Sequence, residues 1–218
     1  GAERECRHAV QLNRASPIVH YYYGFHCLRP MGRLDEALWQ LRQAVELDPL
    51  SPVYNTLLGY LNFATGQCDL GIEQHRRAMD LDPSFFLPHW LLGLAYQHTG
   101  RFEEAIAAAQ KAYELSGRTA DAVGLLALAY GLAGRQDEAR ALLEELTAQR
   151  RVTYVPAHAI AVAYRGLGEA DHALEWVEKG VEERDLLLVC GLISDPRYAP
   201  LRGHPRFRAL LHKMNLED

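Results

Sequence analysis

The sequence predicts an all-α solenoid built from antiparallel helix pairs, and three observations predict it. First, a glycine followed by a short polar segment recurs every 34 residues, at Gly32, Gly66, Gly100, Gly134 and Gly168. Second, apolar residues follow these glycines at helical spacing, as in the stretch 102–113. Third, Asp-Pro pairs break the chain after residues 47 and 81. A fixed period of this size is typical of helical repeats, in which each unit packs against its neighbours.

Each repeat reads as helix, turn and helix. Ser16-Pro17 and Ser51-Pro52 predict helix starts, because serine can cap a helix and proline is tolerated at its first position. The recurring glycine predicts the turn between two helices, where a positive φ is cheap for glycine. A small residue follows five positions later and predicts a close helix crossing. We therefore place five repeats at 18–51, 52–85, 86–119, 120–153 and 154–187.

The two ends of the chain depart from this pattern. Residues 7–12 match the second-helix stretches 43–47 and 77–81, so we expect residues 1–15 to be the second helix of a truncated leading repeat. We therefore expect the chain to be a fragment of a longer protein. Residues 188–218 leave the period and predict a helical capping segment. We expect a short apolar helix from Leu186 to Ile193, and a last helix after Gly203 that holds Phe207, Leu210, Leu211 and Met214. Such a segment would cover the apolar face that a solenoid end exposes.

Composition excludes several classes of protein. The formal net charge of −5 argues against nucleic acid as a partner. No apolar run approaches the roughly 18 residues that a membrane helix needs, and no signal peptide is visible. We therefore expect a cytoplasmic protein. Cys6, Cys27, Cys68 and Cys190 have no metal-binding or redox-motif spacing, so we expect buried thiols in a reducing compartment and no metal or other cofactor.

Catalytic motifs are absent from the sequence. It contains no HExxH, GxSxG, Walker or dinucleotide-binding pattern. Acidic pairs such as Asp35-Glu36 and Glu103-Glu104 recur with the repeat, which indicates a structural role at helix starts, where the helix dipole favours anions. We expect a protein that is not an enzyme, whose function lies on a surface.

The repeats resemble the tetratricopeptide repeat family from about residue 2 to 187. Leu58-Gly59, Leu92-Gly93 and Leu126-Ala127 match the leucine and small residue of the family's first helix; the aromatic and the closing proline are matched by Tyr96, Tyr130, Tyr164, Pro49 and Pro83. Departures occur at Phe25, Asn62, Gly71 and His75. The resemblance implies a right-handed superhelix whose first helices line a concave groove.

The inward stripe of the first helices supplies the candidate site. Spacing of i, i+3, i+7 and i+10 selects these partner-binding residues: Tyr22, His26, Arg29, Thr56, Tyr60, Phe63, Trp90, Gln97, His158 and Arg165. The aromatic members in repeats one to three predict a groove that holds an extended or helical peptide, because aromatic side chains dominate binding energy. Repeat four, with Gly124 and Gly131 on its stripe, predicts no anchor. The alternative is that these aromatics form helix–helix core or face a neighbouring chain.

A second resemblance concerns the last third of the chain. The stretches 151–156, 182–185 and 195–207 resemble a tail of multidomain bacterial signalling proteins, where repeats follow a winged-helix regulator, a nucleotide cyclase or a serine/threonine kinase. This resemblance implies a protein-interaction scaffold that regulates an attached domain. The alternative is a domain that senses a small ligand or self-associates as a homo-oligomer. A closed pocket near His89 would favour the ligand-sensing alternative.

Overall fold

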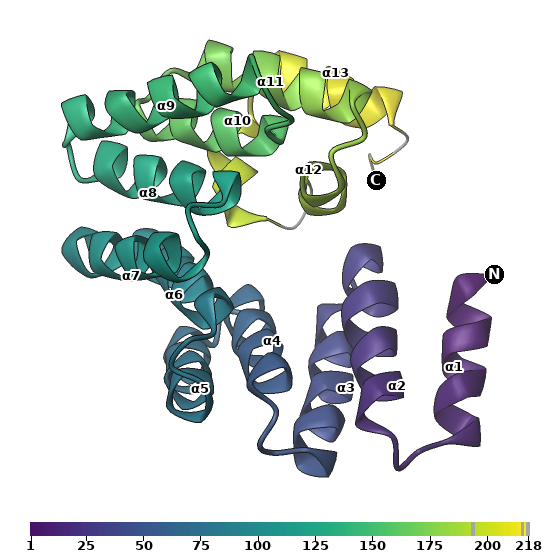
Figure 1. Ribbon diagram of the computed structural model, residues 1–218. Coiled ribbons are helices and arrows are strands. Elements are labelled where there is room, and N and C mark those ends of the chain that lie inside the picture. Colours follow the sequence, from purple (N-terminus) through teal and green to yellow (C-terminus); the bar gives the residue numbers. More distant parts are fainter. Residues whose placement is uncertain (193–194, 215, 217–218) are drawn as a thin grey trace. The chain divides into compact units, whose positions relative to one another are not determined.

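The structure is a computed structural model that describes residues 1–192, 195–214 and 216. Every regular element in these residues is a helix (Figure 1). The chain divides into two compact units, Gly1–Ala95 and Tyr96–Asp218. No helix formed by the described residues combines the length and the apolar character that crossing a bilayer requires.

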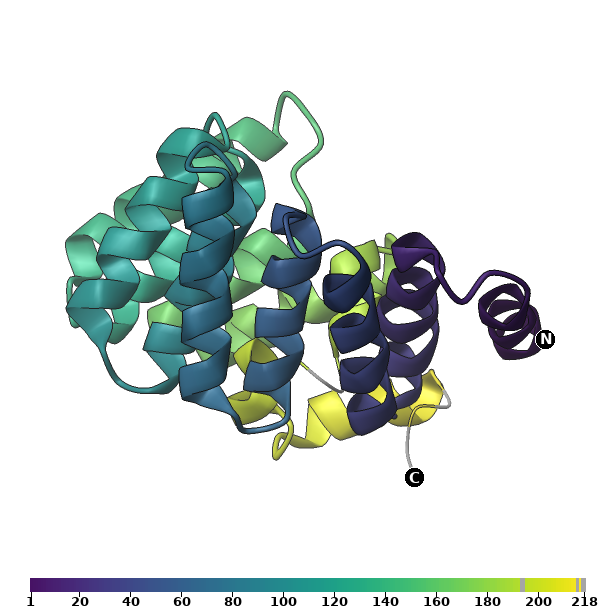
Figure 2. The ribbon, with the colours of Figure 1, turned by 90° about the horizontal axis from the view of Figure 1, so that it is seen from below.

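Unit 1 begins with α1 (Ala2–Leu12), which lies beside the next helical segment at the amino-terminal end (Figures 1 and 2). That segment passes from an α-helix to a π-helix and then to a 3-10 helix, and regular α-helices follow it. The elements are α2 (Pro17–Tyr21), the π-helix η1 (Tyr22–Leu28), the 3-10 helix η2 (Arg29–Met31), α3 (Leu34–Leu47), α4 (Pro52–Ala64), α5 (Cys68–Leu81) and α6 (Phe86–His98), within which the second unit begins.

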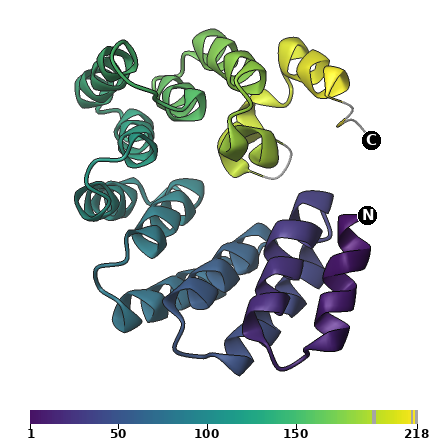
Figure 3. The ribbon, with the colours of Figure 1, turned by 45° about the vertical axis from the view of Figure 1, so that its right-hand side comes forward.

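Unit 2 stacks helix pairs that are seen nearly end-on in Figure 3 and then adds a tail. Its repeat helices are α7 (Phe102–Leu115), α8 (Ala120–Leu132), α9 (Gln136–Arg150), α10 (Ala157–Gly166) and α11 (Ala170–Glu182). The tail consists of α12 (Leu186–Gly191), the 3-10 helix η3 (Pro196–Leu201) and α13 (Pro205–Lys213). Ile193, expected at the end of the apolar tail helix, lies outside the described residues.

The turns between paired helices follow the sequence prediction. The repeat glycines adopt positive φ, for example +73° at Gly32 and +81° at Gly66. The helix starts agree in part. The Ser51 hydroxyl caps α4 by accepting a hydrogen bond from the Tyr54 amide at 3.3 Å, whereas Ser16 makes no side-chain cap at α2, so its predicted capping role is wrong. Pro17 occupies the first position of α2, as expected.

The first helix of repeat one is not the regular α-helix that its neighbours are. The segment from Pro17 to Gly32 is one residue longer than the segment from Pro52 to Gly66. The fold accommodates the extra residue by widening the helix into the π-helix η1, in which bonds run from i to i+5. Counted from the proline, Tyr21 rather than Tyr22 then corresponds to Thr56. Before the π-helix, the residues that face inward therefore lie one position earlier in the sequence than predicted. Tyr22, which was predicted to face inward, faces solvent instead.

Close packing of α8 against α10 explains the glycines of repeat four. Gly124 and Gly131 are buried, and a Cβ atom on Gly124 would approach the Ala159 carbonyl oxygen to 2.6 Å. A Cβ atom on Gly131 would collide with the Gly166 backbone. The prediction that these glycines lie on a smooth groove surface is therefore wrong. They let two helix backbones approach each other, which a side chain would prevent.

Replacing Gly131 by alanine is expected to destabilise the protein by about 2 kcal/mol, because the added methyl group meets backbone that cannot move aside. Urea unfolding followed by circular dichroism measures this. Gly203→Ala is the matched control, since a Cβ atom there meets nothing within 4 Å. Equal stabilities of the two variants would show that the α8–α10 contact tolerates a wider spacing.

The tail packs onto the end of the repeats as a cap. Tyr198 of η3 and Phe207 of α13 are fully buried, and they join one apolar cluster with Leu174 and Val177 of α11. Leu210 is buried in the same cluster, as the sequence predicted for the last helix. The apolar side of α11 is thereby removed from water, which supplies the stabilisation that a following repeat would otherwise provide.

Candidate partner-binding site

Unit 1 carries a cluster of aromatic side chains contributed by α2, η1 and α4. Tyr21 lies at its centre, with ring centroids 4.9 Å from Tyr22, 6.3 Å from Phe25, 5.2 Å from His26 and 5.7 Å from Tyr54. The contact with Phe25 is stacked and the other three are tilted or edge-on, arrangements that aromatic quadrupoles favour. We call Tyr21, Tyr22, Phe25, His26, Arg29, Tyr54 and Tyr60 the aromatic cluster.

A cation lies at the far end of the cluster. Phe25 contacts the Tyr60 ring edge-on at 5.8 Å, and the Arg29 guanidinium lies 4.4 Å from the Phe25 centroid and 5.8 Å from that of Tyr60. The Nε of Arg29 donates a hydrogen bond to the Phe25 carbonyl oxygen at 3.2 Å, which fixes the guanidinium beside the rings. The spacing of Tyr21, Phe25 and Arg29 is four residues each, so they form one row along the helical segment.

His26 contacts the rings of Tyr21, Tyr22 and Phe25 and is hydrogen-bonded to the first of them. Its Nε2 lies 2.8 Å from the Tyr21 hydroxyl, a contact across five residues that π-helical winding favours. Desolvation by the neighbouring rings, followed by the positive charge of Arg29, lowers the pKa of His26. The imidazole is therefore neutral at pH 7, and its hydrogen bond to Tyr21 is one between neutral groups.

The cluster is open to solvent at one side. Tyr22 is 52% exposed, and His26 is exposed as well. Phe25, Tyr54 and Tyr60 are half-buried, so their rings form a floor held by packing rather than a set of free side chains. A surface of this kind presents aromatic area whose rotamers are already restricted.

Four of the predicted site residues come together in this cluster: Tyr22, His26, Arg29 and Tyr60. Sequence reasoning missed Tyr21, Phe25 and Tyr54. The run of three tyrosines at 21–23, followed by Phe25, was the available signal, together with the extra residue between Pro17 and Gly32. The predicted residues Phe63, Trp90 and Arg165 are half-buried, and their roles stay predictions.

Thr56 and Gln97 do not face solvent, so their predicted places on an open groove are wrong. Thr56 is fully buried, and its hydroxyl donates to the Pro52 carbonyl oxygen at 2.6 Å. Gln97 is buried, and its amide nitrogen donates to the Leu125 carbonyl oxygen at 3.4 Å. Both side chains satisfy their polar groups on backbone inside the stack, as buried polar groups generally must.

His158 is also buried, which corrects its predicted role as a groove residue. Its Nδ1 lies 2.9 Å from Oδ2 of Asp185, and its Nε2 lies 2.9 Å from Oδ1 of Asp121. Burial disfavours its charge, but the nearby carboxylate of Asp121 and the hydrogen-bonded carboxylate of Asp185 outweigh that penalty and raise the pKa of His158. Burial also acts against the Asp185 carboxylate, yet His158 and two backbone amides lower the pKa of Asp185. The trio joins α8, α10 and the start of α12, where Asp185 caps the helix.

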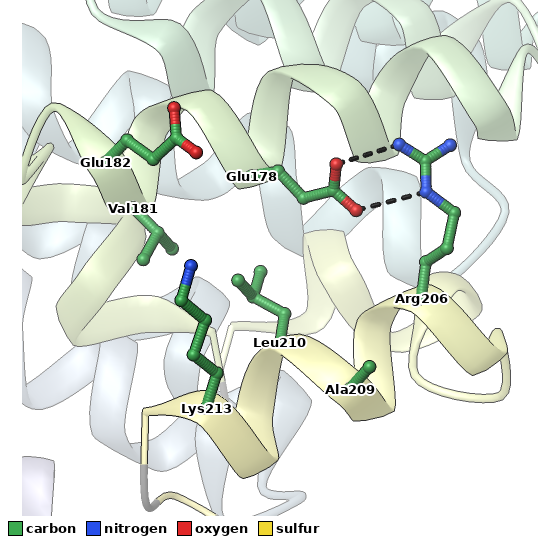
Figure 4. A pocket seen from close by; sticks show the side chains of 7 residues that line it. All are labelled: Glu178, Val181, Glu182, Arg206, Ala209, Leu210 and Lys213. Atoms are coloured by element: carbon green, nitrogen blue, oxygen red, sulfur yellow. Dashed lines mark hydrogen bonds and ion pairs between the residues drawn. The ribbon is translucent and has the colours of Figure 1, made fainter.

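Two cavities have fewer aromatic side chains to offer a partner than the aromatic cluster has. One, of about 280 Å³, lies between α11 and α13. Figure 4 shows Arg206 bridging to Glu178 at one end, at 2.8 Å, with Glu182 and Lys213 at the other. The second, of about 490 Å³, includes Gly1, His26 and Met31 among its lining residues. Neither is lined by His89, where the ligand-sensing alternative expected a pocket. Within residues 1–192, 195–214 and 216, no group of three or more His, Cys, Asp or Glu side chains could hold a metal ion.

Stacked antiparallel helix pairs, with a glycine turn every 34 residues, define a tetratricopeptide-repeat fold. Residues 86–118 and 120–145 each match a model of the tetratricopeptide repeat. No curated protein matches the chain.

Three solved structures show what the chain resembles. The crystal structure of MamA protein is 25% identical, with 72% of this chain and 88% of that chain covered at a TM-score of 0.57. A thermophilic tetratricopeptide-repeat protein of Thermus thermophilus is 20% identical, with 90% and 100% covered at 0.63. YrrB, titled a tetratricopeptide-repeat protein with an unusual peptide-binding site, is 19% identical, with 84% and 94% covered at 0.53. These likenesses establish the fold.

Proposed function

We propose that this chain is a non-catalytic protein-interaction module that binds a peptide or protein segment on the aromatic cluster of unit 1. The observation that carries the proposal is the placement of Tyr22. Its ring is 52% exposed and lies beside the rings of Tyr21 and His26, in the cluster that carries the Arg29 cation at its far end. A large apolar side chain at the edge of a rigid aromatic surface is the kind of group that anchors a partner.

The energetics favour binding at this place. Aromatic and arginine side chains make up most binding hot spots, and each contributes about 2 kcal/mol or more when buried by a partner. The rings of Phe25, Tyr54 and Tyr60 are already packed, so little rotamer freedom is lost on association. YrrB shares this fold and has a peptide-binding site, which supports a peptide as the class of partner.

The setting of the module is part of the same proposal. The tail motifs at 151–156, 182–185 and 195–207 support a regulatory role within a larger bacterial signalling protein. Cys6, Cys27 and Cys68 are free, half-buried thiols, which supports a reducing, cytoplasmic compartment. Cys190, whose side chain lies outside the described residues, adds nothing to this argument.

Peptide selection tests the proposal. Random 12-residue peptides displayed on phage are selected on the wild-type chain, and the Kd of the enriched peptides is measured by fluorescence polarisation. Tyr22→Ala is expected to weaken their binding at least tenfold, because the partner loses its exposed aromatic anchor. The Tm should stay near that of the wild type, since half of this side chain is in water already.

Tyr154→Ala is the matched control. Tyr154 is a tyrosine of unit 2 that is 66% exposed and lies outside the aromatic cluster. Its removal should leave the Kd unchanged. Failure to enrich any peptide, or peptides that bind the Tyr22→Ala chain as tightly as the wild type, would contradict the proposed function.

A further inference from the structure

Arg29 differs from the other arginines of this chain that lie over aromatic rings. Arg101 lies 4.3 Å from the Tyr96 centroid and Arg135 lies 4.6 Å from that of Tyr130. Arg118 and Arg150 lie similarly over Tyr113 and Trp176. Each of these four is also paired with a carboxylate: the partners are Glu104, Glu138, Glu145 and Glu183. Their positive charge is neutralised within the chain.

The Arg29 guanidinium has no such partner. Within the part of the chain that the structure describes, no carboxylate pairs with it, and its Nε–H is taken up by the Phe25 carbonyl oxygen. A guanidinium has five N–H donors, so the four on its two terminal nitrogens have no acceptor among the described residues. These four donors form a planar fork that matches the two oxygens of a carboxylate.

The surroundings of Arg29 strengthen its attraction for an anion. The side chain is half-buried between Phe25 and Tyr60, where the rings reduce contact with water and the effective dielectric falls. His26, the neighbouring titratable group, is neutral at pH 7 because its pKa is lowered. The unneutralised cation of Arg29 therefore lies beside the rings of Phe25 and Tyr60.

We propose that the partner segment carries a glutamate or aspartate a few residues from an aromatic residue, with the carboxylate on the Arg29 fork and the aromatic ring on Tyr22. This inference rests on the proposed function and names the chemistry of its partner. The charge requires an oxyanion, and the exposed Tyr22 ring requires an apolar group. Tyr22 and Arg29 are seven residues apart along one helical segment, about 10 Å, so the two partner groups should be about three extended residues apart. An acidic side chain alone would leave Tyr22 uncovered, and an aromatic residue alone would leave the cation unpaired.

The peptides selected on the wild-type chain provide the first test. Enriched sequences are expected to contain Asp or Glu about three positions from an aromatic residue. Enriched peptides that depend on Tyr22 yet show no acidic preference would overturn this inference while the proposed function stands.

A double-mutant cycle provides the second test. Glu→Gln in the best peptide and Arg29→Gln in the protein are each expected to raise the Kd at least tenfold, and the two changes together should raise it little further. Arg29→Lys should restore part of the affinity, because it keeps the charge and loses the fork. Independent effects of the two changes would overturn the pairing.

Two further arms complete the design. Arg135→Gln is the matched control, since Arg135 also lies over a ring but is already paired with Glu138, and the Kd should not change. Phosphoserine in place of the glutamate tests the other source of an oxyanion. A phosphopeptide that binds more than tenfold tighter than the glutamate peptide would assign the site to phosphorylated segments and overturn the carboxylate assignment.

Discussion

Replacing His75 by leucine is expected to protect the protein against acid. His75 is 1% exposed in α5, its Nδ1 has no hydrogen-bond partner among the described residues, and burial lowers the pKa of His75 to about 3. An unfolded histidine has a pKa near 6.5. The folded protein therefore holds its full stability above pH 6.5 and loses about 1.4 kcal/mol per pH unit as the pH falls from there towards 3. The leucine variant lacks this loss, a difference on the order of 3 kcal/mol at pH 4.

Leucine suits this position because the repeat already uses it. Leu41 occupies the equivalent place one period earlier and packs against Gly24, as His75 packs against Gly59. Urea unfolding of the wild type and of His75→Leu at pH 7, 5.5 and 4 measures the effect. His8→Leu, which changes an exposed histidine of α1, should follow the wild-type curve. Parallel pH curves for wild type and His75→Leu would show that His75 is not the acid-sensitive group.

Removing the carboxylate of Asp185 is expected to cost about 3–5 kcal/mol of stability. Asp185→Ala takes away the ion pair with His158, the acceptor for the His158 backbone amide at 2.9 Å, and the cap of α12. His158 is 1% exposed and would remain beside Asp121 without its second partner. Hydrogen exchange should show the loss first in α10 and α12, which Asp185 joins.

The pH dependence identifies the ionic part of this effect. The pKa of His158 is raised, so its contribution is complete below about pH 6.5, the pKa of an unfolded histidine, and is lost as the pH rises through the folded value. The pKa of Asp185 is lowered, so its contribution is complete above about pH 4 and is lost in stronger acid. The wild type should exceed Asp185→Ala most between about pH 4 and 6.5.

A surface pair provides the comparison. Glu145→Ala breaks the exposed pair with Arg118 at 3.0 Å and should change the stability by about 0.5 kcal/mol or less. A loss for Asp185→Ala no larger than this, at every pH, would mean that the buried trio adds nothing to the stability of unit 2.

The repeat period predicted most of the secondary structure for a local reason. A turn glycine, a first-position proline and apolar residues at helical spacing act within one helix pair, so Gly66, Pro52 and the stretch 102–113 sufficed to predict the fold. The cap could be predicted as well, because an uncovered apolar face needs a cover and Phe207 and Leu210 supply it.

The site was only partly predictable. The spacing of residues along one helix identifies the side chains that share a face, but it does not identify the helix that packs against that face. Gly131 and His158 lie on the predicted stripe, but α8 and α10 pack closely enough to bury both. In repeat one, the rings of Tyr21 and Phe25 pack against each other, and Tyr22 remains in solvent.

By itself, the sequence determined that this protein consists of stacked helix pairs with a terminal cap, because periodicity and turn chemistry are properties of neighbouring residues. Only the tertiary structure decided which side chains remain available to a partner. Exposure depends on how closely the next helix approaches, and a single extra residue between Pro17 and Gly32 was enough to change the winding of a helix and with it the residues that face water.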